Sequence, residues 1–143
     1  MTDSSGFSLI ELLVVILIIG VLAAILIPSF LSSTAKASDA QTKELVRTAE
    51  TTAEAIAVAN DGKYGKVTPE ELKAAEPTIE TAAGKGRAYV LKTTHGESEY
   101  SVTAKATNGD EFTISRDANG TITRSCISSP GKTDCGGKET STW

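Results

Sequence analysis

The sequence predicts an α+β fold, in which one long N-terminal α-helix packs on a four-stranded antiparallel sheet. Three observations predict it. An almost uninterrupted apolar stretch fills residues 7–27, and small and apolar side chains then recur at helical spacing as far as residue 59. Between residues 88 and 125, short segments rich in Val, Ile and Thr are separated by turns that contain Gly. The rest of the 143-residue chain has room for one small domain and not for two.

The apolar stretch from Phe7 to Ile27 is long enough to cross a bilayer, which takes about 20 apolar residues. A secretory signal peptide fits less well, because its apolar core is usually only about 7–15 residues long and follows basic residues. Glu11 is the one ionisable residue within the stretch. Because a carboxylate is costly in hydrocarbon, an acid at this place predicts a functional role. The alternative is an ordinary signal anchor that happens to carry a Glu.

The helix is expected to continue past the apolar stretch, kinked at Pro28, because proline lacks an N–H and clashes with the preceding turn. From Ser29 to Ala59 there is no Gly and no further Pro, and Asn60 then begins an Asn-Asp-Gly stop. Two helices broken at Pro28 are the alternative. Small and apolar residues near the helical period predict the face that is covered by the sheet. They are Leu31, Ala35, Leu45, Ala49, Ala53, Ile56 and Ala59.

A connector is expected over residues 61–87. Within it Thr68 precedes Pro69, and Glu71 follows, which is the pattern of an N-terminal capping box. This pattern predicts a short helix over residues 69–76.

The sheet is expected over residues 88–125. Its strands should break at His95-Gly96, Asn108-Gly109 and Asn119-Gly120, since Asn-Gly supplies the positive φ of tight hairpin turns. The alternation of apolar and polar residues along these strands predicts one covered face and one solvated face. The covered face suits the apolar side of the long helix.

Composition and charge narrow the functional classes. The formal net charge is −4 and the basic residues are not clustered, so no specific nucleic-acid partner is expected. His95 is the only histidine, expected in a solvated turn, and no catalytic set of Ser, His and Asp can be completed away from it. We therefore expect no enzyme activity, no cofactor and no metal site.

The octapeptide GFSLIELL, which begins at Gly6, resembles the processing site and helix start of type IV pilins. The resemblance implies that a prepilin peptidase cuts after Gly6 and that the new N-terminal residue, Phe7, is N-methylated. Glu11 then becomes the fifth residue of the mature chain, the position at which this family has its conserved glutamate. It implies a role in filament assembly for Glu11 and for the amine of Phe7.

Two later residues also match the family. Gly20 and Pro28 fall where type IVa pilins have a glycine and a proline that weaken the helix. One feature departs from the family pattern, because residues 1–6 contain no Lys or Arg, whereas most prepilin leaders carry one near the cut.

The resemblance implies a domain plan for the chain. A leader of residues 1–6 is removed, residues 7–28 form a transmembrane and filament-core helix, and residues 29–143 form the pilin globular domain. That domain comprises the helix to about residue 60, the connector, the sheet, and a C-terminal disulfide loop and tail over 126–143.

Cys126 and Cys135 are the only cysteines and follow the expected sheet. Two cysteines in an exported chain predict a disulfide, although two free buried thiols are the alternative. In type IV pilins a bridge at this place delimits an exposed surface loop. The tail from Gly136 is expected to be mobile apart from Trp143.

The expected function is that of a structural subunit of an extracellular type IV pilus, serving adhesion, motility or DNA uptake. It begins as a single-pass precursor in the inner membrane, and its partners are prepilin peptidase, the inner-membrane pilus assembly machinery and further copies of itself in a helical filament. The alternative is a pseudopilin of a type II secretion system. The major secretion pseudopilin usually carries a calcium site of acidic ligands near its last strands. Here Asp134 and Glu139 make no dense carboxylate cluster, and the cysteine pair favours the pilin.

Overall fold

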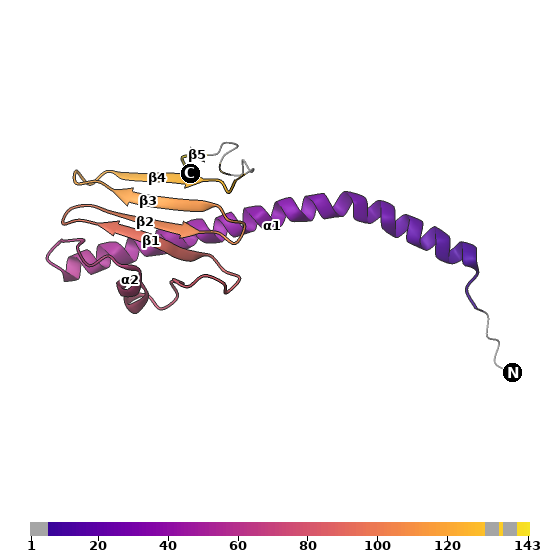
Figure 1. Cartoon of the computed structure of the whole chain (residues 1–143), viewed down its shortest axis with the longest axis horizontal. Coiled ribbons are helices and arrows are strands. Elements are labelled where there is room, and N and C mark those ends of the chain that lie inside the picture. The colour runs from indigo at the N-terminus through magenta and orange to yellow at the C-terminus, as the bar shows by residue number, and fades with distance from the viewer. Residues whose placement is uncertain (1–5, 131–134, 136–139) are drawn as a thin grey trace. The chain divides into compact units, whose positions relative to one another are not determined.

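The computed structural model describes residues 6–130, 135 and 140–143. The chain forms two compact units, which divide between Lys36 and Ala37. The N-terminal unit is helical, and the C-terminal unit holds the rest of that helix, a short second helix and an antiparallel sheet (Figure 1). The predicted α+β class is confirmed.

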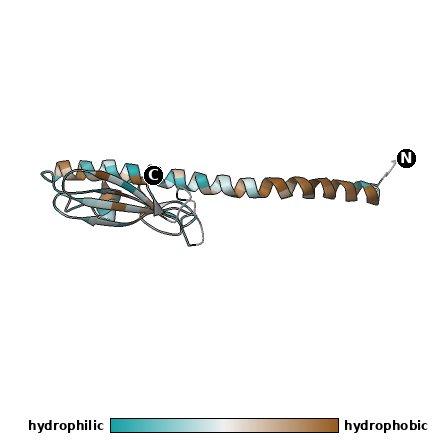
Figure 2. Cartoon of the chain, turned by 90° about the horizontal axis from the view of Figure 1, so that it is seen from above, coloured by the Kyte–Doolittle hydropathy of each residue, from teal (hydrophilic) through white to brown (hydrophobic). Residues whose placement is uncertain are grey.

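Helix α1, Leu9–Ala59, is continuous, so the alternative of two helices broken at Pro28 is wrong. Its apolar residues are concentrated toward its N-terminus, as the brown ribbon in Figure 2 shows. The helix ends at the expected stop. There the N–H of Gly62 donates to the carbonyl of Ala57 at 2.8 Å, and Asp61 and Gly62 have φ values of 55° and 77°. Residues in this left-handed region commonly terminate helices, because their N–H groups satisfy carbonyls of the last turn.

The sheet has five strands, which lie side by side in sequence order. They are β1 (Tyr89–His95), β2 (Tyr100–Lys105), β3 (Glu111–Arg116), β4 (Ile122–Ile127) and β5 (Thr140–Ser141). The first four are the strands expected from the sequence. Gly109 and Gly120 adopt φ values of 98° and 87° in the turns before β3 and β4, as the Asn-Gly pairs predict.

Three details of the sheet differ from expectation. His95 lies at the end of β1, paired with Tyr100, and not in a turn. Strand β4 extends to Ile127, so Cys126 lies inside the strand and not after it. Thr140–Ser141, in the tail expected to be mobile, pairs with the end of β4 as β5. This pairing satisfies backbone groups that β4 would leave unpaired as an edge strand. The sequence did not predict β5, because two residues are too few to show a strand pattern.

Trp143 attaches the end of the chain to the rest of the C-terminal unit. Its indole Nε1–H donates to the carbonyl of Ser125 at 2.9 Å, and its ring meets the Phe112 ring edge to face at 5.9 Å between centroids. The charged groups of Lys43 and Arg47 lie 5.8 and 5.5 Å from the centre of an indole ring that is rich in electrons, which is within cation–π range.

Within the C-terminal unit, α1 packs on one face of the sheet. The predicted helix face is right at Ala49 and Ala53, which are completely buried, and wrong at Ala59, which is exposed. Leu31 belongs to the N-terminal unit, where it is exposed. Val46, which the predicted face omitted, is completely buried. Four polar residues that it also omitted are buried as well: Ser38, Asp39, Thr42 and Thr52.

Short polar side chains can be buried here because their polar groups are satisfied. The hydroxyls of Thr42 and Thr52 donate to carbonyls four residues earlier in α1, at 2.7 and 2.8 Å. Asp39 and the completely buried Asp110 both accept from the amide of Asn108, at 2.7 and 3.3 Å. Asp110 also accepts from the backbone N–H of Ser129 at 2.7 Å, so this network joins α1 to two loops of the sheet.

A second polar cluster surrounds Glu54 near the C-terminal end of α1. The hydroxyls of Tyr64 and Tyr100 donate to its carboxylate at 2.6 and 3.1 Å, and Arg116 Nε lies 3.6 Å away. Burial raises the pKa of both tyrosines above the ordinary value, and the negative charge of Glu54 adds to this effect. Both phenols therefore remain protonated donors at neutral pH.

The connector contains α2, Pro69–Ala75, which starts as the capping-box pattern predicts and ends one residue earlier than expected. The Thr68 hydroxyl accepts from the N–H of Glu71 at 3.2 Å. After α2, the ion pair with Lys85 and the N–H of Ala82 lower the pKa of Glu80 to about 2. Glu80 is therefore ionised at neutral pH and holds the connector in place.

Candidate functional site

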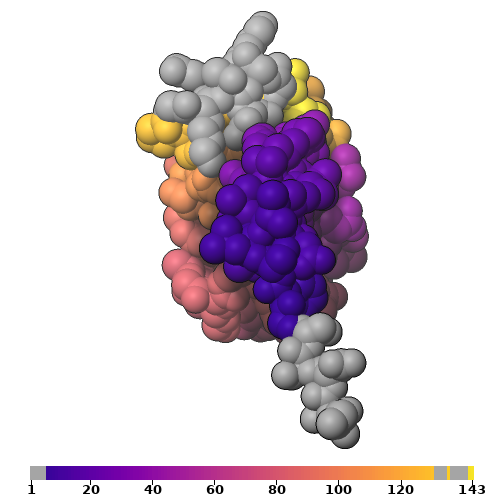
Figure 3. All heavy atoms as spheres, turned by 90° about the vertical axis from the view of Figure 1, so that its right-hand side faces the viewer, coloured from indigo at the N-terminus to yellow at the C-terminus, as the bar shows by residue number. Residues whose placement is uncertain are grey.

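The N-terminal unit presents an exposed apolar surface. Phe7 is 91% exposed and Leu9 is 80% exposed, and the large side chains that follow as far as Ile27 are also exposed. On the face seen in Figure 3, the indigo residues lie open to solvent. Among the described residues, α1 is the one helix long and apolar enough to cross a membrane. Since proteins that stay monomeric in water rarely expose so large an apolar area, this surface requires lipid or other apolar helices around it.

At the start of this helix, Ser8 and Glu11 form a reciprocal capping box. The N–H of Ser8 donates to Glu11 Oε2 at 2.8 Å, and the N–H of Glu11 donates to the Ser8 hydroxyl at 3.3 Å. Two backbone donors at the helix start are thereby satisfied, and the carboxylate lies where the helix dipole favours negative charge. Sequence reasoning missed this cap, although Ser followed three residues later by Glu is the pattern that signals it.

The cap places Glu11 close to Phe7. The N–H that Glu11 Oε2 accepts belongs to Ser8, the residue directly after Phe7. The other carboxylate oxygen, Oε1, accepts no hydrogen bond from a described residue. The carboxylate is thus bonded to the residue that follows Phe7 at the start of α1, and it keeps one oxygen for a further donor.

Gly20 and Pro28 lie further along the same helix. A Cβ added at Gly20 would meet no atom within 4 Å outside its own helical turns, so this glycine opens the surface between Leu13, Leu17 and Ala24. Just after Pro28, the hydroxyls of Ser33 and Thr34 donate to carbonyls four residues earlier, at 3.0 and 2.7 Å. Proline removes a helical donor and such hydroxyls compete for carbonyls, so we expect a weaker hydrogen-bond ladder here.

In the C-terminal unit, a disulfide joins Cys126 of β4 to Cys135, with Cα atoms 5.9 Å apart. The alternative of two free thiols is therefore wrong. Both cysteines are buried, and the N–H of Cys135 donates to the Ser128 hydroxyl at 2.9 Å. Residues 131–134 inside the bridge, Asp134 among them, lie outside the described part of the chain, as does Glu139.

Cys126→Ser should lower the free energy of unfolding of the C-terminal unit by about 2–3 kcal/mol, the loop-entropy contribution of a short bridge. The single Trp, Trp143, reports unfolding near the bridge, so fluorescence during denaturant titration of the detergent-solubilised chain measures the change. Reduced wild-type chain is the matched control and should unfold at the same denaturant concentration as the variant. An oxidised wild type that unfolds together with both of them would contradict a stabilising bridge.

No group of three or more His, Cys, Asp or Glu suited to a metal ion occurs among the described residues. His95 lies with Glu99 and Asp117 at a polar groove of the sheet, far in sequence from the apolar helix. The site that the structure builds most fully is therefore the N-terminal helix itself.

Comparisons with known proteins agree with this site. Residues 1–27 match the family model described as the prokaryotic N-terminal methylation motif. Two curated fimbrial proteins of Pseudomonas aeruginosa are each 30% identical to the chain over 129 residues, which is 84% of this chain and 84% of each relative. No solved structure gives a significant match.

A methylation motif that opens a long apolar helix, followed by a helix-on-sheet unit, defines a fimbrial subunit of the prepilin type. The chain belongs to the type IV pilin family. This is a family of structural proteins, in which a processed precursor assembles into a filament through its N-terminal helix.

Proposed function

We propose that the chain is a structural subunit of an extracellular type IV pilus that serves adhesion, motility or DNA uptake. The observation that carries the proposal is the exposed apolar helix that begins at Leu9, two residues after the Gly6-Phe7 junction. A bilayer covers this helix in the precursor, and the same helices of other subunits cover it in the filament. In the pilus, therefore, the apolar surface is no longer covered by lipid but is still shielded from water.

In this proposal prepilin peptidase removes residues 1–6 in the inner membrane and methylates the new amine of Phe7. The assembly machinery then transfers the subunit from the membrane to the base of the filament. The disulfide between Cys126 and Cys135 supports an exported pilus subunit over a type II secretion pseudopilin.

The charges at the helix tip would set the register of the subunits. Cleavage makes the Phe7 nitrogen a positive amine, next to the Ser8 N–H that Glu11 Oε2 already accepts. An isolated charge inside an apolar filament core is unfavourable, whereas a paired one is tolerated. The free Oε1 of Glu11 would accept the amine of its own chain or of a neighbouring subunit. A misplaced subunit would leave both charges unpaired, while apolar packing supplies most of the cohesion.

The weakened stretch between Gly20 and Pro28 would let the helix adapt during packing. Gly has a high conformational freedom and Pro28 removes a hydrogen bond, so this stretch can extend at the lowest cost in α1. If residues 20–28 extend in the filament, a filament reconstruction should show a rise per residue there greater than the roughly 1.5 Å of an α-helix.

Mass analysis of intact subunits tests the proposal at its first step. Subunits from sheared filaments should begin at Phe7 and carry one additional methyl group on the N-terminal amine. Subunits of the membrane fraction from the same cells are the comparison and should show the same N-terminus. A chain that retains Met1, or one cut beyond Ala24, would contradict the pilin function.

A further inference from the structure

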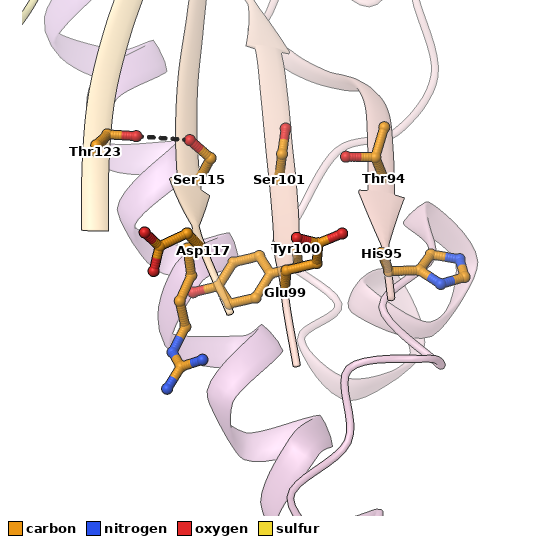
Figure 4. Close-up of a pocket in the computed structure, with 9 residues that line it drawn as sticks. Thr94, His95, Glu99, Tyr100, Ser101, Ser115, Asp117 and Thr123 are labelled. Atoms are coloured by element: carbon orange, nitrogen blue, oxygen red, sulfur yellow. Dashed lines mark hydrogen bonds between the residues drawn. The ribbon is translucent and has the colours of Figure 1, made fainter. Parts of the chain in front are cut away.

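A polar groove crosses one end of the solvent face of the sheet, on the opposite face from α1. It encloses about 330 Å³, near the lower end of the roughly 300–1,000 Å³ range of small-ligand sites. Its floor is a row of hydroxyl side chains, one from each of four adjacent strands (Figure 4). The row consists of Thr94, Ser101, Ser115 and Thr123, which are direct neighbours in the strand register.

The groove forms because short side chains in this row lie beside longer ones at the strand ends. Glu99 directly precedes β2 and Asp117 directly follows β3. Each is two residues from a Ser of the floor, so it points to the same face of the sheet. In Figure 4 both carboxylates lie below the row of hydroxyls, that of Glu99 below Ser101 and that of Asp117 below Thr123 and Ser115.

The hydroxyls of the floor retain unused hydrogen-bonding capacity. Ser115 and Thr123 bond to each other at 2.8 Å, which uses one proton and leaves the second hydroxyl proton of the pair available. The hydroxyls of Thr94 and Ser101 make no hydrogen bond to another described residue. The floor thus offers closely spaced groups that both donate and accept, at the interstrand spacing of about 4.8 Å. A ligand with several adjacent hydroxyls is complementary to such a surface.

The rim of the groove disfavours an anion. Asp117 accepts backbone N–H groups of its turn through Oδ1, at 2.8 and 2.9 Å, and Glu99 adds a second carboxylate. Arg116 also lines the groove, but its guanidinium donates to the carbonyl of Ser98 at 3.0 Å and lies 3.6 Å from Glu54 of α1. Glu54 thereby offsets the charge of Arg116, which leaves the two carboxylates of Glu99 and Asp117 in the groove.

We propose that this groove binds a neutral or amine-bearing saccharide, through the hydroxyl row and the carboxylates of Glu99 and Asp117. His95 and Tyr100 are the ring-bearing residues that line the groove. The Tyr100 ring is buried and its hydroxyl donates to Glu54 of α1, so affinity comes mainly from hydrogen bonds to the floor and a single site binds weakly. The site belongs to one subunit and does not require a filament. In a filament, repeated copies would raise the avidity for a polysaccharide.

Ligand-observed NMR on the full-length chain, in a detergent without a sugar headgroup, tests the site. The probes are the methyl glycosides of glucosamine, glucose and glucuronic acid, which share a ring but differ in charge. We expect binding to be strongest for the glucosamine glycoside, weaker for the glucose glycoside and absent for the glucuronide.

Two variants on β3 distinguish a site from a generally polar surface. Ser115→Val should weaken binding about three- to tenfold, the loss expected for one hydrogen bond, while β-branched Val suits the strand. Thr113→Val is the matched control, because Thr113 lies on the same face, outside the groove, and also loses one cross-strand hydroxyl bond, of 2.9 Å to Thr103. It should bind as the wild type does.

Three results would each overturn the proposal. They are no binding of the glucosamine and glucose glycosides, equal binding of the glucuronide, and equal effects of the two valine variants. The Trp143 fluorescence of each variant verifies that the C-terminal unit is folded.

Discussion

Glu11→Ala chains are expected to enter the membrane and lose their leader normally, yet to assemble few or no filaments. The carboxylate lies at the tip of α1 with Oε1 free of described partners, beside the residue whose nitrogen cleavage turns into an amine. Without it, each Phe7 amine would be moved from the membrane surface into an apolar core with no opposite charge. Apolar packing is unchanged, so insertion and processing should be unaffected.

Two further variants separate the charge of Glu11 from its role as a helix cap. Glu11→Gln keeps an oxygen that can accept the Ser8 N–H but removes the charge, since Gln also serves in capping boxes. It should be as deficient as Glu11→Ala. Glu11→Asp keeps the charge on a shorter side chain and should assemble partially.

Electron microscopy of sheared filaments, with a membrane immunoblot as the control for expression, measures these outcomes. Normal filaments from Glu11→Gln would reduce the role of Glu11 to helix capping. Normal filaments from Glu11→Ala would show that the carboxylate has no part in assembly.

Gly6→Val should accumulate as uncut precursor in the membrane, because the resemblance to prepilins requires a small residue before the cut. The structure argues against a steric or backbone defect as the cause, since a Cβ at Gly6 would meet no atom within 4 Å and Gly6 has no positive φ. Folding of the C-terminal unit should therefore be the same as in the wild type. Without the free amine of Phe7, few filaments should form.

Gly6→Ala is the matched control for this variant, since alanine is also small and should permit cleavage. An immunoblot resolves the precursor from the shorter mature chain, and mass analysis identifies the N-terminus. Complete cleavage of Gly6→Val at the same bond would contradict the assignment of Gly6-Phe7 as the processing site.

The sequence by itself determined the elements whose cause is local. The length and apolarity of residues 7–27, the Asn-Asp-Gly stop after Ala59 and the capping pattern at Thr68 each act within a few residues, and the structure has a helix or a helix end at each. The Asn-Gly turns likewise preceded β3 and β4 as predicted, because positive φ is a property of the turn residue itself. The Ser8–Glu11 cap was equally local and was readable from the same pattern.

Only the tertiary structure decided which residues meet across long separations. Asp39 and Asn108 are 69 residues apart, and Glu54 and Tyr100 are 46 apart, yet both pairs are hydrogen-bonded. These contacts bury polar parts of α1 that a hydrophobic stripe leaves out, so the covered face of the helix differs from the predicted one. Strand β5 and the docking of Trp143 depend on an edge that β4 offers only after the sheet has formed. The groove on the solvent face has the same origin, since its four hydroxyls become neighbours through strand register and carry no signal in the sequence of any one strand.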